Sequence, residues 1–442
     1  MMNIMTLLTN VGLHLNGWRH PEAWDNTVLN FEQLVECAQM AERAKIDMVF
    51  LPDGSGVREM HNRELFEAMT PSSRPAVFEP VTLLSALSVV TTRIGLVATA
   101  STTYDEPFHV ARRYASLDHL SKGRAGWNVV TGSNEGDAPN FSAKKHLAKD
   151  LRYEKAREFV EVVLGLWDSW ADDAFIQDKH SGRYLNADRV RALEHVGDHF
   201  QVKGPLNVAR SPQGRPVVFH AGQSEAGLEL AAHAADCVFA VAGTLEQAQV
   251  ITADLKARAV RHGRSPDSLK VLMSASIYPG ATQEQADALG HALDALTSPT
   301  LALGNLSKLV AVDLSGYDVD GPMPELCEAM EGASAPRKII NAWVRKERPT
   351  IRDVYLRYSR TLGSPVFRGT ALHIADQMEA WYRAGACDGF LIGPAVMPTS
   401  LQLFTREVIP ELQRRGLFRT EYPGKTLRDI INLPAPPNQF FT

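Results

Sequence analysis

The residues best suited to hold a cofactor stand at the ends of three apolar runs. Each run changes over a few residues from β-branched or small apolar side chains to Thr, Asn, Gly, Gln or Ser. The three segments are Ile94–Thr102, Gly123–Thr131 and Arg215–Ser224. A buried strand that ends in this way presents hydroxyl, amide and backbone N–H groups at one edge of a sheet. We therefore predict that the three ends line one shared pocket.

Eight short apolar runs, which include the three above, alternate with stretches of helical periodicity. Residues 28–41, for example, place an apolar stripe along one helical face. Eight strand–helix alternations favour a (β/α)8 TIM barrel, an α/β fold whose active sites lie at the carboxyl ends of the strands, over an open sheet. The predicted strands are Val11–Leu15, Asp47–Leu51, Ile94–Thr99, Ala125–Val130, Pro216–Ala221, Asp236–Val241, Lys270–Ile277 and Asp388–Ile392.

We expect one domain over residues 1–442, because barrels with insertions exceed about 400 residues without dividing. Residues 132–214 and 281–386 are too long for ordinary connections, and long connections in a compact barrel are usually functional insertions. We expect both insertions to cover the carboxyl-terminal mouth of the barrel. The last segment, Tyr422–Pro437, has turn residues and little periodicity, so we expect it to run over the surface.

The composition excludes several classes of protein. Hydrophobic residues make up 45% of the chain and charged residues 22%, a balance typical of a globular protein with a large core. A formal net charge of −5 without long Lys/Arg runs argues against nucleic-acid binding. No apolar stretch reaches the about 18 residues of a membrane span, and the amino terminus lacks signal-peptide features. The four cysteines, which lack CxxC spacing, are expected to be reduced core thiols of a soluble, cytoplasmic protein: Cys37, Cys237, Cys327 and Cys387.

Three further segments, Leu166–Trp170, Val202–Asn207 and Pro410–Arg419, extend the pattern over nearly the whole chain. On all these segments the chain resembles the bacterial luciferase-like flavin monooxygenases, within them the nitrilotriacetate, dibenzothiophene-sulfone and pristinamycin-type subfamily. The resemblance implies the oxygenase component of a two-component enzyme, which uses reduced FMN (FMNH2) and O2. Its substrate would be a small amine, sulfur compound or aromatic, and some relatives break a C–N or C–S bond after oxygenation.

The turn Gly222-Gln223-Ser224 opens a helical run and can hold a phosphate. Backbone N–H groups and the positive end of the helix dipole meet there, although Ser224 could simply cap the helix. The resemblance assigns this turn to the FMN phosphate and adds Tyr153 as a second ligand. Relatives carry His four residues before this tyrosine, whereas this chain has Lys149. Lys149 could contact the phosphate or be a solvated lysine, and the nearby His146 could replace the missing imidazole.

Three residues at strand ends are candidates for contacts with the flavin ring. The resemblance places Asp53, after the run Met48–Leu51, and Thr99 beside the ring. Asn128 stands at the end of another run and could form a hydrogen bond to the ring edge. For Asp53 the alternative is the capping of a turn at Asp53-Gly54.

Histidines supply the candidates for proton transfer. His14 lies in the run Val11–Leu15, where it would face the pocket mouth and, with a pKa near neutral, could exchange a proton with the reacting flavin. The alternative is a core or rim histidine bonded to backbone. His220 stands where relatives usually have Gln, and His61 could contact substrate, but both are weaker candidates than His14.

The sequence lacks the motifs of several other chemistries. Gly54-Ser55-Gly56 has neither the third glycine nor the helix of a dinucleotide site, and HExxH, metal-ligand spacings and GxSxG do not occur. We therefore expect no bound metal and expect a separate NAD(P)H:flavin reductase to supply reduced FMN. We also expect a homo-oligomer, either a dimer or a tetramer.

Two other functions remain open on this fold. One is a deazaflavin- or flavin-dependent hydride-transfer oxidoreductase, which would turn over without O2. The other is a non-catalytic flavin-binding protein, because a fold alone does not fix a function. The reaction of the protein with photoreduced FMN and then with O2 separates all three.

Overall fold

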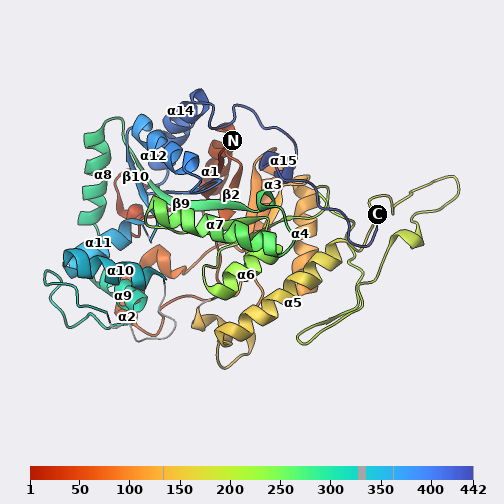
Figure 1. Cartoon of the computed structure of the whole chain (residues 1–442), viewed down its shortest axis with the longest axis horizontal. Coiled ribbons are helices and arrows are strands. Elements are labelled where there is room, and N and C mark those ends of the chain that lie inside the picture. The colour runs from red at the N-terminus through yellow and green to blue at the C-terminus, as the bar shows by residue number, and fades with distance from the viewer. Residues whose placement is uncertain (133, 327–334, 362, 442) are drawn as a thin grey trace.

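In a computed structural model of the chain, which describes residues 1–132, 134–326, 335–361 and 363–441, eight parallel strands close into a barrel (Figure 1). The barrel closes because β8 and β11 both pair with β9, and β11 pairs with β1. This is the predicted (β/α)8 TIM barrel. The strands are β1 (Asn3–Leu7), β2 (Met48–Leu51), β3 (Gly95–Ser101), β4 (Ala125–Val130), β7 (Val217–His220), β8 (Cys237–Ala240), β9 (Lys270–Pro279) and β11 (Gly389–Pro394).

The first predicted strand is wrong. β1 is Asn3–Leu7, which pairs with β2 on one side and β11 on the other. The segment Val11–Leu15 instead turns at Gly12, where φ is +80° and an added Cβ would lie 2.4 Å from the Ala395 carbonyl oxygen. Both segments are apolar, so periodicity does not separate them. The pairing with two distant strands decides between them, and a local pattern does not contain that information.

The other predicted strands agree with the structure to within two residues at each end. A ninth strand, β10 (Val366–Gly369), was not predicted and pairs in parallel with Ser276–Pro279 of β9. It lies inside residues 281–386, where a four-residue run carries little signal. A two-stranded hairpin, β5 (His195–Val196) with β6 (Gln201–Val202), lies between β4 and β7 along the chain.

Helices surround the barrel and begin at recognisable caps. Ser224 caps α6, and Pro80 and Pro107 occupy the first turns of α3 and α4, as their first-turn preference predicts. These helices pack against the outward-facing apolar side chains of the strands. The barrel helices include α1 (Phe31–Arg43), α3 (Pro80–Val90), α4 (Pro107–Ser121), α5 (Lys149–Trp167), α6 (Glu225–Ala234), α7 (Leu245–Arg261) and α12 (Ala371–Arg383).

The barrel interior is apolar and is closed at its amino-terminal end by the carboxyl-terminal tail. Inward-facing residues of the strands, such as Phe219 and Phe239, form one cluster with Leu427, Ile430 and Ile431 of the tail. The expectation that the tail runs over the surface is therefore wrong for α15 (Leu427–Ile430) and the residues after it. A short apolar helix that plugs a barrel is too brief for its periodicity to be read from the sequence.

Helices from distant parts of the chain gather at the carboxyl-terminal end of the barrel. Figure 1 shows α2 (Arg63–Met69) beside α9 (Pro299–Val310), α10 (Ala335–Glu347) and α11 (Ile351–Thr361). Lys308 of α9 forms an ion pair with Glu59, and Tyr278 Oη at the end of β9 donates to the Arg360 carbonyl oxygen over 3.0 Å. The helix α8 (Gln283–Ala295) directly precedes α9 along the chain.

Two further facts bear on the expectations from composition. None of the described helices is long and apolar enough to cross a membrane. Cys37, Cys237 and Cys387 are buried free thiols, as predicted, and Cys327 lies outside the described residues.

Candidate active site

Strand alternation aims Thr99 and Asn128 into the barrel. Val97 and Gly126 contact interior side chains, so residues two positions further along β3 and β4 face the same way. Thr99 and Asn128 are register partners, and Asn128 Nδ2 donates to Thr99 Oγ1 over 3.0 Å. Both residues are buried, and Asn128 Oδ1 has no hydrogen-bond partner. The pair leaves a buried acceptor at the carboxyl-terminal end of the barrel.

Ser224, Tyr153 and Gly222 lie together at the start of α6. Ser224 Oγ accepts from Gly227 N as the helix cap and donates to Tyr153 Oη, each over 3.3 Å. A Cβ on Gly222 would lie 2.9 Å from Tyr153 Oη and 2.5 Å from His220 Nε2, so a glycine is needed there. Capping by Ser224 does not exclude phosphate binding, because two hydroxyls and the remaining N–H groups meet at the same helix end.

The side chain of Gln223 joins two strand ends. Its Nε2 donates to the Val241 carbonyl oxygen over 3.0 Å, and its Oε1 accepts from Val241 N over 3.1 Å. Because both polar groups are engaged, only the backbone of Gln223 is available for a phosphate.

Lys149 and His146 have different surroundings. Lys149 is the first residue of α5, is exposed, and forms no hydrogen bond or ion pair with the described residues. It precedes Tyr153 by four residues, so the two side chains share a helix face. His146 Nδ1 lies 2.5 Å from Tyr104 Oη, while its Nε2 is buried without a partner. Burial lowers the pKa of His146, which favours its neutral ring.

Asp53 follows β2 and is half-buried. Burial raises the pKa of its carboxyl above the usual value, against the opposing effects of the Gly54 N–H and the Arg74 guanidinium. Because β2 pairs in parallel with β3, Asp53 lies just beyond β2 at the same end of the barrel as Thr99 and Asn128.

His14 lies in the loop after β1 and not at the end of a strand, because the predicted first strand is misplaced. It is 2% exposed, and burial, which outweighs the nearby Asp294, lowers the pKa of His14 to about 4. The expectation of a pKa near neutral is therefore wrong. Its Nδ1 accepts from Asn16 N over 3.1 Å, so the ring hydrogen is on Nε2, which is buried and has no partner. His14 presents a neutral N–H donor.

The two weaker histidine candidates differ in burial. His220 ends β7, is buried, and donates from Nδ1 to the Val129 carbonyl oxygen over 2.9 Å. Burial lowers the pKa of His220 to about 4. The side chain of His61 is 81% exposed, and Glu59 Oε2 lies 3.9 Å away.

Two arginines at this end of the barrel were missed. Arg74 Nη1 and Arg152 Nε and Nη1 are buried and have no hydrogen-bond partner. The position of Arg152 directly before Tyr153, near the start of a helix, was a usable signal, although adjacent helix residues point in different directions. Arg74 precedes a proline in a loop, and its sequence context carries no signal.

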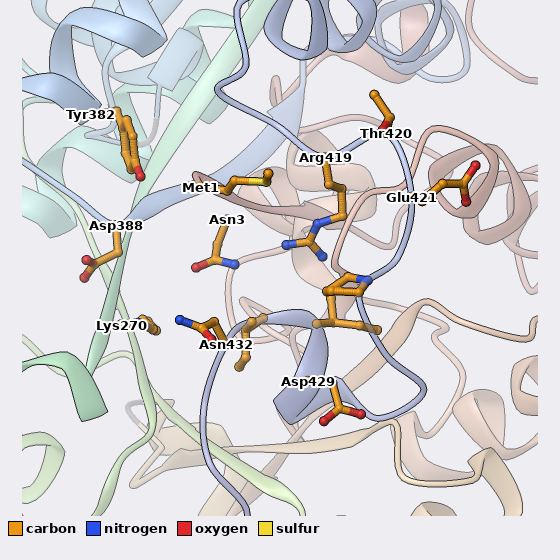
Figure 2. Close-up of a pocket in the computed structure, with 13 residues that line it drawn as sticks. Met1, Asn3, Lys270, Tyr382, Asp388, Arg419, Thr420, Glu421, Asp429 and Asn432 are labelled. Atoms are coloured by element: carbon orange, nitrogen blue, oxygen red, sulfur yellow. The ribbon is translucent and has the colours of Figure 1, made fainter.

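The opposite end of the barrel contains a cavity of about 480 Å³, which Figure 2 shows between the first residues of the chain and the tail. Carboxylates that line this cavity are already engaged. Asp388 accepts from Lys256 Nζ over 3.0 Å, and Glu421 lies 3.4 Å from Lys45 Nζ. The cavity opens at the amino-terminal ends of the strands, where barrel enzymes do not place their chemistry.

The residues at the mouth fit a flavin mononucleotide. Its ring edge needs hydrogen-bond partners, which the unpaired Asn128 Oδ1 and the buried Thr99 can supply. Its phosphate needs N–H and O–H donors, which Ser224, Tyr153 and the turn at Gly222 supply. Among the described residues, no group of three or more His, Cys, Asp or Glu side chains could hold a metal ion.

A family model described as luciferase-like monooxygenase matches residues 5–387. The chain belongs to the luciferase-like monooxygenase family. It is 44% identical to N-acetyl-S-(2-succino)cysteine monooxygenase of Bacillus subtilis (strain 168), over 98% of this chain and 97% of that protein. It is 43% identical to nitrilotriacetate monooxygenase component A of Aminobacter aminovorans, over 99% and 97% of the two chains.

A solved structure of this family supports the same assignment. The chain resembles riboflavin lyase, crystallised with modified FMN and riboflavin, with a TM-score of 0.84 and 31% identity. The likeness covers 98% of this chain and 96% of that one. The family resemblance predicted from the sequence is therefore confirmed, and a structure that the chain resembles was solved with modified FMN.

Proposed function

We propose that the chain is the oxygenase component of a two-component monooxygenase that uses reduced FMN and O2. The observation that carries this proposal is the pairing of two half-sites at one end of the barrel. Thr99 and Asn128 offer polar groups to a ring, and Ser224 and Tyr153 offer donors to a phosphate. When bound, reduced FMN would supply the two electrons with which O2 delivers one atom to the substrate and one to water.

The residues of the chain would bind, orient and shield. Asn128 Oδ1 would accept from the ring edge, and Asp53 would lie beside it. The end of α6 with Ser224, Tyr153 and the backbone of Gly222-Gln223 would hold the phosphate, and Lys149 would add a charge. His14 would donate its Nε2 hydrogen to the reacting group, because its imidazole is neutral at pH 7 and carries its one N–H at Nε2.

The substrate and partner follow from the relatives. Nitrilotriacetate is a tertiary amine and N-acetyl-S-(2-succino)cysteine a thioether, so we propose a small organic substrate oxidised at nitrogen, sulfur or an aromatic ring. Loss of a C–N or C–S bond would follow oxygenation. One relative is named component A, which supports a separate NAD(P)H:flavin reductase as the partner of this chain.

A coupled assay with isotopically labelled O2 tests this function. The purified chain, FMN, NADH and a flavin reductase are combined with amine and thioether substrates, and products are analysed by mass spectrometry. We expect one labelled oxygen atom per product, and no NADH consumption when the reductase is omitted. Steady NADH oxidation by the chain alone, or turnover without O2, would contradict the proposal.

A further inference from the structure

Two arginines at the barrel mouth have charges that no neighbouring residue pairs with. Neither the Arg152 nor the Arg74 guanidinium forms a hydrogen bond or ion pair with the described residues. A guanidinium that is partly removed from water without a partner is costly, because water no longer satisfies its N–H groups. Such a group is expected where a ligand supplies the missing acceptors.

Arg152 lies beside Tyr104 and His146, above the ends of β3 and β4. Its charge acts on the pKa of both neighbours, and the His146 ring lies over Gly132, where an added Cβ would be 3.8 Å from Cε1. His146 Nε2 is also buried and unpaired. Arg152 and His146 therefore leave three buried nitrogen atoms without partners in one cluster.

Arg74 lies at the same mouth of the barrel. A Cβ on Gly54 would be 3.6 Å from Arg74 Nη1, which places this guanidinium beside the turn after β2. Its charge interacts with Asp53 and Asp137, and the positive charge of Arg58 is also close.

The nearby carboxylates do not pair with the two guanidinium groups. Asp137 accepts from Asn134 Nδ2 over 2.8 Å, and Glu59 is paired with Lys308. Asp53 and Asp137 act on this part of the mouth together with Glu79 and Glu135, but none of these carboxylates forms a hydrogen bond or ion pair with Arg74 or Arg152. The buried N–H groups of both arginines are therefore left for the acceptors of a ligand.

We propose that Arg152 and Arg74 bind carboxylate groups of the substrate, which makes the substrate an organic acid with at least one and preferably two carboxylates. A planar guanidinium pairs with a carboxylate through two parallel hydrogen bonds. The flavin phosphate is assigned to Ser224 and the Tyr153 hydroxyl, which meet at the start of α6. Arg152 directly precedes Tyr153 in α5, but its charge lies near Tyr104 and His146, and Arg74 lies beside Gly54. This inference rests on the proposed function for the identity of the ligand as substrate.

Calorimetric titration with simple acids tests the proposal. Succinate and citrate are titrated into the full-length chain with and without FMN, and succinamide is the uncharged match for succinate. We expect succinate and citrate to bind and succinamide not to bind. Arg152→Gln and Arg74→Gln should each weaken the two acids by about tenfold, as expected for a charge-assisted hydrogen bond. Arg406→Gln is the matched control, because Arg406 is exposed and pairs only with its neighbour Glu407.

The ratio of the affinities for FMN and riboflavin separates the substrate from the flavin phosphate. We expect this ratio to be the same in Arg152→Gln, Arg74→Gln and the unmodified chain. A lower ratio in either variant would overturn the proposal, as would equal binding of succinate and succinamide or unchanged acid binding in both variants. If Arg74→Gln does not fold, Arg152→Gln carries the test. Failure of the oxygenase function would appear as absent oxygen transfer, which this titration does not measure.

Discussion

The two ends of the barrel differ in how fully their buried polar groups are paired. At the amino-terminal end, the Arg124 guanidinium donates five hydrogen bonds to Ser88, Thr91, Ile94 and Ser121. At the carboxyl-terminal end, His14, Asn128 and Arg152 each keep at least one buried nitrogen or oxygen atom without a partner. Folded proteins pair nearly all buried polar groups, so a concentration of unpaired ones indicates a site that a ligand completes.

The tail supplies part of the pairing at the amino-terminal end. Arg428 of α15 forms two hydrogen bonds to the Asp236 carboxylate, over 2.8 and 3.2 Å, directly before β8. Four charged side chains at this end also have buried atoms without a hydrogen-bond partner: Asp47, Asp118, Arg215 and Arg419. Arg419 nevertheless lies within ion-pair distance of Asp47, and Asp118 accepts from Ala125 N and Gln213 Nε2. The charge of Arg215 interacts with Asp236. The charged groups at this end therefore have oppositely charged or hydrogen-bonded neighbours, whereas the Arg74 and Arg152 guanidinium groups at the mouth form no hydrogen bond or ion pair with the described residues. Barrel enzymes show the same division between a stabilising amino-terminal end and a functional carboxyl-terminal end.

The largest effect is expected from Arg428→Met. It leaves the buried Asp236 carboxylate without its bidentate partner, and such a loss costs about 3–5 kcal/mol. We expect the free energy of unfolding in urea to fall by about this amount, while the folded fraction binds FMN normally. A variant with unchanged stability, or with weakened FMN binding in its folded fraction, would break the division between the two ends.

A smaller effect is expected from His220→Gln at the mouth. The pKa of His220 is about 4 in the folded chain and about 6.5 when unfolded, so the unfolded chain binds the proton first. This pKa difference does not change the free energy of unfolding above about pH 6.5, and it lowers that free energy as the pH falls towards 4. The variant cannot be protonated, so its stability should fall by about 2–3 kcal/mol less than that of the unmodified chain between about pH 7 and pH 4.5. If urea unfolding shows the same loss of free energy in the variant and in the unmodified chain, the burial of His220 is contradicted.

Lys149→Met should have the smallest effect, which is a lower affinity for FMN alone. If Lys149 contacts the phosphate, loss of its charge lowers the affinity for FMN by about tenfold, or about 1.4 kcal/mol, and leaves riboflavin unaffected. Tyr153→Phe is the reference, because it removes one hydroxyl from the same helix face. Equal losses for both ligands would indicate a disturbed mouth, and no loss would make Lys149 a solvated residue.

The sequence predicted the barrel because its strands are short apolar runs between long periodic helices. It misplaced β1 and missed the plug at α15, since both depend on partners that are hundreds of residues away. The candidate ring and phosphate residues came from strand and helix ends, which local patterns mark well. The unpartnered Arg74 guanidinium and the low pKa of His14 could not be predicted. Both depend on burial, which arises only when distant loops pack together.

The proposed function requires the mouth to hold reduced FMN and to control its reaction with O2. The most direct test mixes the chain with photoreduced FMN in a stopped-flow instrument, adds O2, and follows the return of oxidised-flavin absorbance. We expect the return to be delayed relative to free reduced FMN and the delay to be lost in Ser224→Ala at the same FMN concentration. Reoxidation at the rate of free FMN, with FMN shown to be bound, would contradict the account.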